Sequence, residues 1–256
     1  MGTKKTNCID TPIKRLPGQG LREERDRLFE ELINEPLMIC FVSIVFLVVE
    51  CLHVFSPIKP SVWIGVGVAV LATVYAVRKC IIGRRELRNY RRGEEGERIV
   101  AQAIEQYLIP VGYKVIHDIP VTKDGHEFNV DHLVIGPNGV FAIETKNYAK
   151  PDRGSPIVRY DGDWLYWNGK RHKKDEAAQA RSAAAAAKEC IARKLGMNLY
   201  VHPVLCAVGW CAYSSDLYGH PVLLVMEKTL GTVIPKVAAR QTLTEEDQRR
   251  ICSALM

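Results

Sequence analysis

Two long apolar runs dominate the hydrophobic pattern in the first third of the chain. Residues 37–55 are interrupted only by Glu50 and His53, and residues 61–77 contain no charged side chain. Each run approaches the ~20 residues that a helix needs to cross a bilayer at ~1.5 Å per residue. Apolar side chains occupy every side of the first predicted helix, so no polar stripe is left for water. The pattern predicts a transmembrane hairpin over residues 37–77, although a buried hairpin in a soluble domain has the same periodicity.

From residue 93 onward, helical and strand periodicities alternate. The tetrapeptide from Gly136 to Gly139 favours a tight turn between two of the predicted strands. An alanine-rich helix follows and stops at Gly196. We expect an α/β domain with strands over residues 113–121, 128–135, 140–145, 157–160, 164–167, 204–208 and 222–226, and helices over residues 94–108, 175–195 and 244–254.

The charge of the chain is confined to one short segment. The formal net charge is +6, and residues 78–92 carry seven basic side chains against Glu86 alone. The rest of the chain is neutral, so the excess is better explained by the positive-inside rule than by a general affinity for phosphates. We therefore expect both termini in the cytoplasm and two membrane spans, in the inner membrane if the source is bacterial.

This pattern divides the chain into four parts. They are a cytoplasmic N-terminal segment (residues 1–36), the transmembrane hairpin (residues 37–77), a basic juxtamembrane linker (residues 78–92) and the α/β domain with a C-terminal strand and helix extension (residues 93–256). The eight cysteines are scattered and form no Cys-x-x-Cys pair. A disulfide scaffold or a cysteine zinc site is therefore not predicted.

The hairpin around Gly136 and Gly139 brings polar side chains together. If these two glycines pair, Asp131 lies opposite Glu144, and Lys146 lies on the same face as Glu144. Adjacent carboxylates repel each other unless they share a cation, and oxygen ligands of this kind suit Mg²⁺. A lysine beside such a metal can orient or deprotonate a water for attack on phosphorus. A plain salt bridge between Asp131 and Lys146 explains the same residues without a metal.

Two further polar residues interrupt apolar helix faces. Glu97 lies on the side of Val100 and Ile104, whereas Glu94 is expected on the outer side of the same helix. Gln179 shares a face with Ala183 and other small residues of the alanine-rich helix. Glu97 is alternatively a helix N-terminal charge stabilised by the dipole. A basic stretch over residues 170–174, beside Trp164, Tyr166 and Trp167, either grips phosphates and stacks a base or is a solvated loop above core aromatics.

These motifs resemble a known family. Gly93-x-x-Gly96-Glu97, the block from Asn129 to Asn147 with Asp131, Glu144 and Lys146, and Gln179 at the start of an alanine-rich helix are similar to the nuclease-related domain (NERD) family of the PD-(D/E)xK nuclease superfamily. The resemblance covers about residues 90–209. It implies an αβββαβ core, Asp131 and Glu144 as metal ligands, Lys146 as the water-activating residue, Glu97 as a supporting acid and Gln179 as a positioning residue.

The chain departs from the family pattern at two places. Asp175-Glu176 stands where Asn-Pro often precedes the glutamine, and Asn129 stands where an acidic residue or glutamine is common. Neither departure removes an implied metal ligand. Both bear on contacts with the substrate.

The resulting hypothesis is a membrane-anchored nuclease acting on DNA rather than RNA. The expected fold is a PD-(D/E)xK nuclease-like α/β core preceded by two transmembrane helices. The predicted metal ligands are Asp131, Glu144 and Thr145, and the cofactor is Mg²⁺ or Mn²⁺. The alternative is a domain of the same fold that binds nucleic acid or a partner protein at the membrane without cutting.

Overall fold

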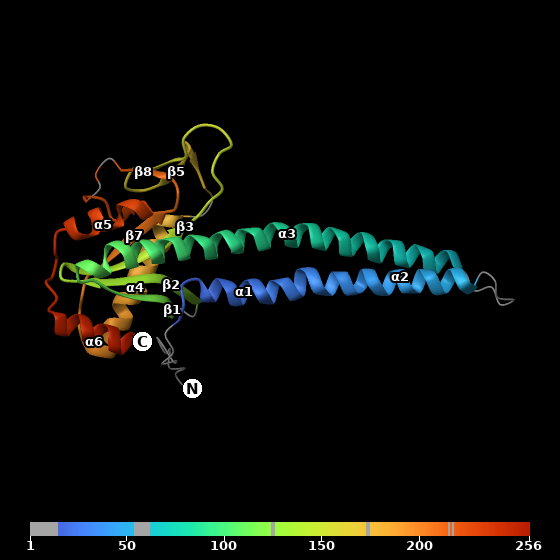
Figure 1. Cartoon of the computed structure of the whole chain (residues 1–256), viewed down its shortest axis with the longest axis horizontal. Coiled ribbons are helices and arrows are strands. Elements are labelled where there is room, and N and C mark those ends of the chain that lie inside the picture. The colour runs from blue at the N-terminus through green and yellow to red at the C-terminus, as the bar shows by residue number, and fades with distance from the viewer. Residues whose placement is uncertain (1–14, 54–61, 124–125, 173–174, 215, 217) are drawn as a thin grey trace. The chain divides into compact units, whose positions relative to one another are not determined.

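The structure is a computed structural model that describes residues 15–256 apart from residues 54–61, 124–125, 173–174, 215 and 217 (Figure 1). The chain divides into two compact units. We call residues 21–91 the hairpin unit, and residues 92–256 together with the N-terminal residues up to Gly20 the sheet unit. The predicted loop between the two apolar runs lies outside the described residues.

The described part of the hairpin unit is helical. Helices α1 (Gln19–Phe29) and α2 (Glu35–His53) are joined by the π-helical turn η1 (Glu30–Asn34), and α3 covers Val62–Tyr107. Two helical stretches, Gln19–Val49 and Val66–Val111, are long and apolar enough to cross a membrane. Many of their large apolar side chains are exposed, with Phe41 at 63% and Leu71 at 71%. This exposure disfavours the alternative of a buried hairpin in a soluble core, because a core would cover these side chains.

The basic segment over residues 78–92 lies inside α3. We expected a linker here, followed by a separate helix over residues 94–108, but one helix covers both. The segment contains no proline, and arginine, lysine, leucine and glutamate favour a helix. Its glycine, Gly83, packs against Leu32 in the same unit, where an added Cβ would lie 2.7 Å from the Leu32 Cβ. The glycine therefore serves close helix packing and does not end the helix.

The sheet unit contains a five-stranded mixed sheet of order β1-β2-β3-β7-β9. The first three strands are antiparallel neighbours, and β7 and β9 run parallel to β3. The strands are β1 (Lys114–Lys123), β2 (His126–Gly136), β3 (Gly139–Lys146), β7 (Val201–Ala207) and β9 (Leu223–Val225). With the end of α3 before β1 and helix α4 (Glu176–Leu195) between β3 and β7, the predicted αβββαβ order is confirmed.

Helices cover both faces of this sheet, which is why its strands are apolar on both sides. On one face, α4 and α6 (Glu245–Leu255) pack against strands β1 to β3 (Figure 1). The alanines of α4 let its backbone approach the strands closely. On the other face, residues of α3 such as Ile104 pack with Phe141 and with Leu230 of α5 (Leu230–Val233). Short 3₁₀ turns complete this side at Ile109–Val111, Glu227–Thr229 and Ile234–Lys236.

The helix ends follow the signals in the sequence. The Asp175 side chain caps α4 by accepting a hydrogen bond from the Ala178 N–H, and Gly196 ends this helix in the left-handed conformation. Thr244 and Asp247 form the predicted capping box of α6. The positions of both helices in the sequence are therefore set by local chemistry as well as by packing.

A second, four-stranded sheet of order β6-β5-β4-β8 packs beside the first. The predicted hairpin is present as β4 (Ile157–Tyr160) and β5 (Leu165–Trp167), while β6 (Lys170–Arg171) and β8 (Cys211–Ser214) were not predicted. Side chains from β4 and β5 enter a third core with Ala177 and Ala180 of α4 and Leu205 of β7. One face of the second sheet is therefore buried against α4 and β7.

The turn between β2 and β3 has the predicted register. Gly136 pairs with Gly139, as the sequence suggested. Asn138 fixes the turn, because its amide donates hydrogen bonds to the carbonyls of Ile234 (2.8 Å) and Val237 (3.1 Å) and its Oδ1 accepts one from the Tyr113 hydroxyl (2.7 Å). The register of β3 is thus held from a distant part of the chain. This register sets which side chains reach the far end of the strand.

Candidate active site

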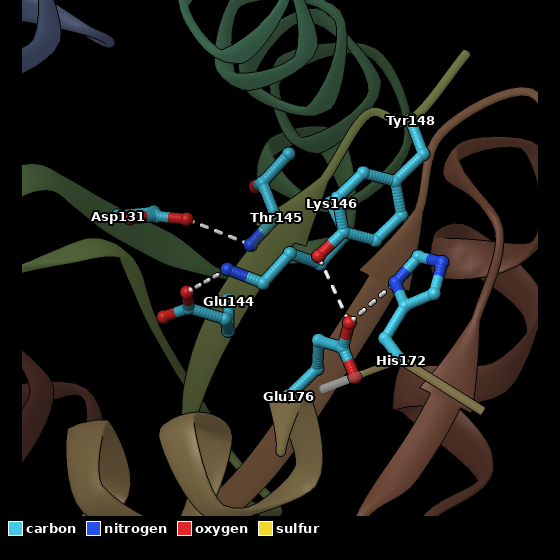
Figure 2. Close-up of polar contacts among 7 residues, drawn as sticks. All are labelled: Asp131, Glu144, Thr145, Lys146, Tyr148, His172 and Glu176. Atoms are coloured by element: carbon cyan, nitrogen blue, oxygen red, sulfur yellow. Dashed lines mark hydrogen bonds and ion pairs between the residues drawn. The ribbon is translucent and has the colours of Figure 1, made fainter. Parts of the chain in front are cut away.

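Most of the predicted site residues meet at the carboxyl end of β3. The register of β2 and β3 pairs His132 with Ile143, so its continuation by one residue sets Asp131 opposite Glu144. The Asp131 carboxylate accepts a 2.7 Å hydrogen bond from the Thr145 backbone N–H, and Lys146 Nζ donates one of 2.6 Å to Glu144 Oε1 (Figure 2). The lysine is therefore paired with Glu144, and the expected alternative of a plain Asp131–Lys146 salt bridge is not what the structure contains.

Glu97 reaches this site because α3 passes very close to the end of β3. Gly96 makes the approach possible, since an added Cβ would lie 2.7 Å from the Asn147 Cβ and 3.4 Å from Thr145 Cγ2. The Asn147 side-chain amide also donates a 2.8 Å hydrogen bond to the Arg92 carbonyl of α3. Glu97 is buried, as predicted. The prediction for Glu94 was wrong: it is also buried, because the chain near Gly18 covers the side of α3 that the periodicity assigned to water.

Negative charge is concentrated at this site. Burial raises the pKa of Asp131 well above its ordinary value, and the carboxylates of Glu144 and Glu97 raise it further. Burial likewise raises the pKa of Glu97 to about 7, with Asp118 adding to the effect and a hydrogen bond from the Gly18 N–H opposing it. Near neutral pH, this group of carboxylates therefore retains protons that isolated acids would have lost.

Lys146 carries the opposite charge. Burial by itself lowers the pKa of its amine, but the carboxylates of Glu144, Asp131 and Glu176 outweigh this effect and the pKa is raised. The amine is therefore an ammonium at neutral pH. An ammonium can orient a water and offset negative charge. It cannot take a proton from water, so the role of general base does not agree with this protonation state.

A second polar network lies beside Lys146 and was not predicted as part of the site. Glu176, in the first turn of α4, is only 2% exposed. Its Oε1 accepts a 2.9 Å hydrogen bond from the Tyr148 hydroxyl and lies 3.0 Å from His172 Nδ1 (Figure 2). Burial raises the pKa of Tyr148, and the nearby charge of Glu176 and its hydrogen bond with the hydroxyl raise it further. In the sequence, the acid directly before Ala177 in an alanine-rich helix was the signal that could have indicated this buried residue.

The N-terminal segment also contacts the site. Asp118, in β1, is buried, has φ of +50° and accepts hydrogen bonds from the Gly20 N–H (2.8 Å) and from Asn129 Nδ2 (2.6 Å). Arg15 Nε lies 3.4 Å from the same carboxylate. There is no space for a side chain at Gly20, because an added Cβ would lie 2.2 Å from Asn129 Nδ2. An aspartate next to a histidine in an apolar strand was the signal for this part of the site.

Gln179 is not brought into this group. Its side chain is exposed, and no hydrogen bond or ion pair within the described residues joins it to Asp131, Glu144 or Lys146. Ala183, one turn later on the same face, is buried against the sheet. The face is open at the level of Gln179, so its role as a positioning residue stays a prediction.

The residues present fit a hard divalent cation by their chemistry. Asp131 and Glu144 offer carboxylate oxygens, the Thr145 carbonyl adds a neutral one, and the nearby acids outnumber the ammonium of Lys146. Among the described residues, no three His, Cys, Asp or Glu side chains are placed so that they could hold a metal together. Mg²⁺ does not require such a set, because it is usually bound by one or two carboxylates and completes its shell with water or substrate phosphate.

Part of the sheet unit is similar to a known protein family. The family model described as the nuclease-related domain (NERD) matches residues 92–208. A stretch of 58 residues is 41% identical to an uncharacterized protein of Bacillus anthracis, and it covers 22% of this chain and 27% of that protein. The chain thus matches about a quarter of the length of this relative. No solved structure gives a significant match.

The raised pKa of Glu97 makes a prediction about stability. In the folded protein this acid keeps its proton to about pH 7, whereas in the unfolded chain it loses the proton near pH 4.3. The folded state therefore loses stability as the pH rises between these values, and the loss persists at higher pH. Glu97→Gln cannot ionise, so in EDTA it should be more stable than the wild type at pH 8, by about 3 kcal/mol, and nearly equal to it at pH 4.

Urea denaturation of the full chain in detergent, followed by tryptophan fluorescence at both pH values, measures this difference. Glu105→Gln, at an exposed position of α3, is the matched control and should behave like the wild type. A Glu97→Gln variant that is destabilised at pH 8 would show that Glu97 is held as a stabilising ion, contrary to this account.

Proposed function

Residues 92–208 of this chain belong to the nuclease-related domain family, and from this we propose that the protein is a membrane-anchored, divalent-metal-dependent nuclease that hydrolyses DNA phosphodiester bonds at the cytoplasmic face of the membrane. The observation that carries the proposal is the meeting of Asp131, Glu144 and Lys146 at the end of β3, with Glu97 added from α3. These residue types suit attack on a phosphodiester, because the reaction needs a cation, an oriented water and a group that offsets developing negative charge.

Each side chain has a role that follows from its environment. Asp131, Glu144 and the Thr145 carbonyl would hold the cation. When bound, such an ion polarises a phosphoryl oxygen and lowers the pKa of a bound water. Glu97, with a pKa of about 7, is suited to hold or release a proton at neutral pH. Lys146, as an ammonium, orients the attacking water and offsets charge on the phosphate.

Glu176 supports this arrangement from the side of α4. Its buried carboxylate helps keep Lys146 protonated. Tyr148 and His172 hold that carboxylate in place through their contacts with its Oε1. We infer that Glu176 is a positioning residue, which acts on the substrate only through the lysine.

Cleavage of DNA by the full chain in detergent tests the proposal. With Mg²⁺, nicking of a plasmid or cutting of a single-stranded oligonucleotide should fall by at least ~10²-fold in Lys146→Ala and in Asp131→Asn, as expected for the loss of a group that stabilises the transition state. Lys188→Ala, at an exposed position of α4, should cut like the wild type. The full chain is used because Arg15 and Gly20 contact the site.

Two results would contradict the enzyme proposal. One is binding of DNA without any Mg²⁺- or Mn²⁺-dependent cutting, which would favour the alternative of a non-catalytic tether. The other is equal activity in Lys146→Ala and Lys188→Ala.

Contacts of the N-terminal segment support the proposed membrane topology. Residues 15–20 precede the first apolar stretch, yet Arg15 and Gly20 contact Asp118 in the sheet unit, which follows the second stretch. These contacts support a topology in which both flanks lie on the same side of the membrane. The seven basic residues between 78 and 92 favour the cytoplasm for that side, by the positive-inside rule.

Reporter fusions test this topology. A reporter that is active only in the cytoplasm should be active after Met256 and before Met1. A reporter that needs export should be active only when inserted within residues 54–61. An exported signal from the Met256 fusion would overturn the orientation, and a soluble full-length protein in cell fractionation would overturn membrane anchoring.

A further inference from the structure

The second sheet has one buried face and one open face. Burial alternates along β4. Val158 and Tyr160 are buried in the third core, while Ile157 and Arg159 are exposed. Strand β5 follows the same rule, because Leu165 and Trp167 are buried and Tyr166 is half-buried. No described helix or strand covers the open face. The face is therefore free to meet something outside this chain.

Arginine and tyrosine alternate across this open face. Arg159 of β4 is in register with Tyr166 of β5 on one side and with Tyr213 of β8 on the other, and Tyr166 is in register with Arg171 of β6. Residues in register on neighbouring strands point to the same face. One row thus crosses four strands in the order Arg171, Tyr166, Arg159, Tyr213. Tyr213 is 58% exposed.

The two guanidinium groups are held over aromatic rings. The Arg171 Cζ lies 3.0 Å from the centre of the Trp164 ring, and the Arg159 Cζ lies 5.5 Å from that of Tyr166. Within the described residues, neither arginine forms an ion pair with a carboxylate. Asp161 accepts hydrogen bonds from the N–H groups of Asp163 and Trp164 in its own turn, and the nearby charge of Arg159 also acts on this carboxylate. Arg159 is thus close to one acid without pairing with it, and a phosphate would compete with Asp161 for this guanidinium group.

Such a row suits a chain that alternates phosphate and flat base. Guanidinium groups bind phosphate through paired N–H donors, and bases stack on aromatic rings or on guanidinium planes. In a duplex the faces of the bases are covered by their neighbours, so a flat sheet with stacking groups favours a single strand.

The β6 edge of the second sheet lies beside the network at Lys146, although that network packs against the buried face and not the open one. His172 directly follows Arg171 at the end of β6, and its ring stacks on Trp167 with 5.7 Å between ring centres. The same His172 contacts Glu176, whose charge acts on Lys146. A strand that leaves the row at Arg171 would therefore pass the β6 edge to reach the network beside the lysine. Lys173 and Lys174, which follow His172 in the sequence, lie outside the described residues.

We propose that the open face of the second sheet, defined by Arg171, Tyr166, Arg159 and Tyr213, binds single-stranded nucleic acid and presents it to the site at Asp131 and Lys146. The second half of this statement rests on the proposed nuclease function, because it names the substrate form of that site. The first half concerns binding alone and is independent of cleavage.

Binding is measured with the full chain in detergent, by fluorescence anisotropy of a labelled oligothymidylate, in EDTA and at low salt. Arg159→Gln and Tyr213→Ala should each weaken binding about tenfold, as expected for the loss of one phosphate contact or one stacked base. Arg250→Gln in α6 and Tyr107→Ala in α3, which change exposed residues outside the second sheet, are the matched controls and should leave the affinity unchanged. A duplex of equal length should bind more weakly, and a ribose strand tells whether DNA is preferred.

Several results would overturn the inference. They are equal affinity of Arg159→Gln and Arg250→Gln, preference for the duplex, or binding to anionic lipid vesicles that the face variants abolish while binding to the oligonucleotide is kept. Measuring binding in EDTA separates the two proposals, because the metal-dependent cutting is absent there. If the strand binds at this face but is never cut, the nuclease proposal fails and the binding site stands. If the face variants bind the strand more weakly in EDTA but cut it as the wild type does, the face does not present the strand to the site and the second half of the proposal fails.

Discussion

Repulsion among buried carboxylates is the constraint on which the site depends. Glu97, Asp131 and Glu144 act on one another at the end of β3, with Asp118 and Glu176 on either side. The ammonium of Lys146 offsets only part of this charge. A fold tolerates such a group when protons or a cation balance it, since an unpaired buried charge is costly. The pKa values of Asp131 and Glu97 are raised, so both acids hold protons more tightly than isolated acids do, and a divalent ion would compete with these protons.

The scaffold serves to hold these acids together against their repulsion. Three antiparallel strands fix the register that opposes Asp131 and Glu144, and Asn138 locks the turn that sets this register. Gly96 lets α3 approach β3 closely enough to add Glu97. The N-terminal segment then adds backbone N–H groups from Gly18 and Gly20. A stretch that precedes the apolar helices is therefore part of the site, although more than 70 residues separate it from the rest of the sheet unit.

Local patterns in the sequence predicted most of the core fold. Alternation, turn residues and capping residues located β2, β3, α4 and α6, because these elements are specified by neighbours in the chain. The pairing of Asp131 with Glu144 followed from the turn at Gly136 and Gly139. Sequence reasoning did not find the continuous helix from residue 62 to residue 107, because a change of composition at residue 78 does not break a helix. It also missed β6 and β8, which are short and depend on distant partners.

The candidate site shows the same limit. Asp131, Glu144 and Lys146 were predicted because one hairpin carries all three. Asp118, Tyr148, His172 and Glu176 were missed because only tertiary packing brings them near. Helical periodicity assigned Glu94 to the surface, yet the N-terminal segment covers it. The periodicity of one helix cannot predict burial by a segment from elsewhere in the chain.

Binding of Mn²⁺ to the full chain tests the central claim most directly, because it asks whether a cation replaces the protons on these acids. Electron paramagnetic resonance of a Mn²⁺ titration in detergent counts bound ions without requiring activity. We expect one site per chain that tightens as the pH rises through 7, since Glu97 and Asp131 must release protons. Asp131→Asn should weaken this site at least tenfold, while Asp152→Asn, at an exposed position, should not. No bound Mn²⁺, or equal binding in the two variants, would contradict the account.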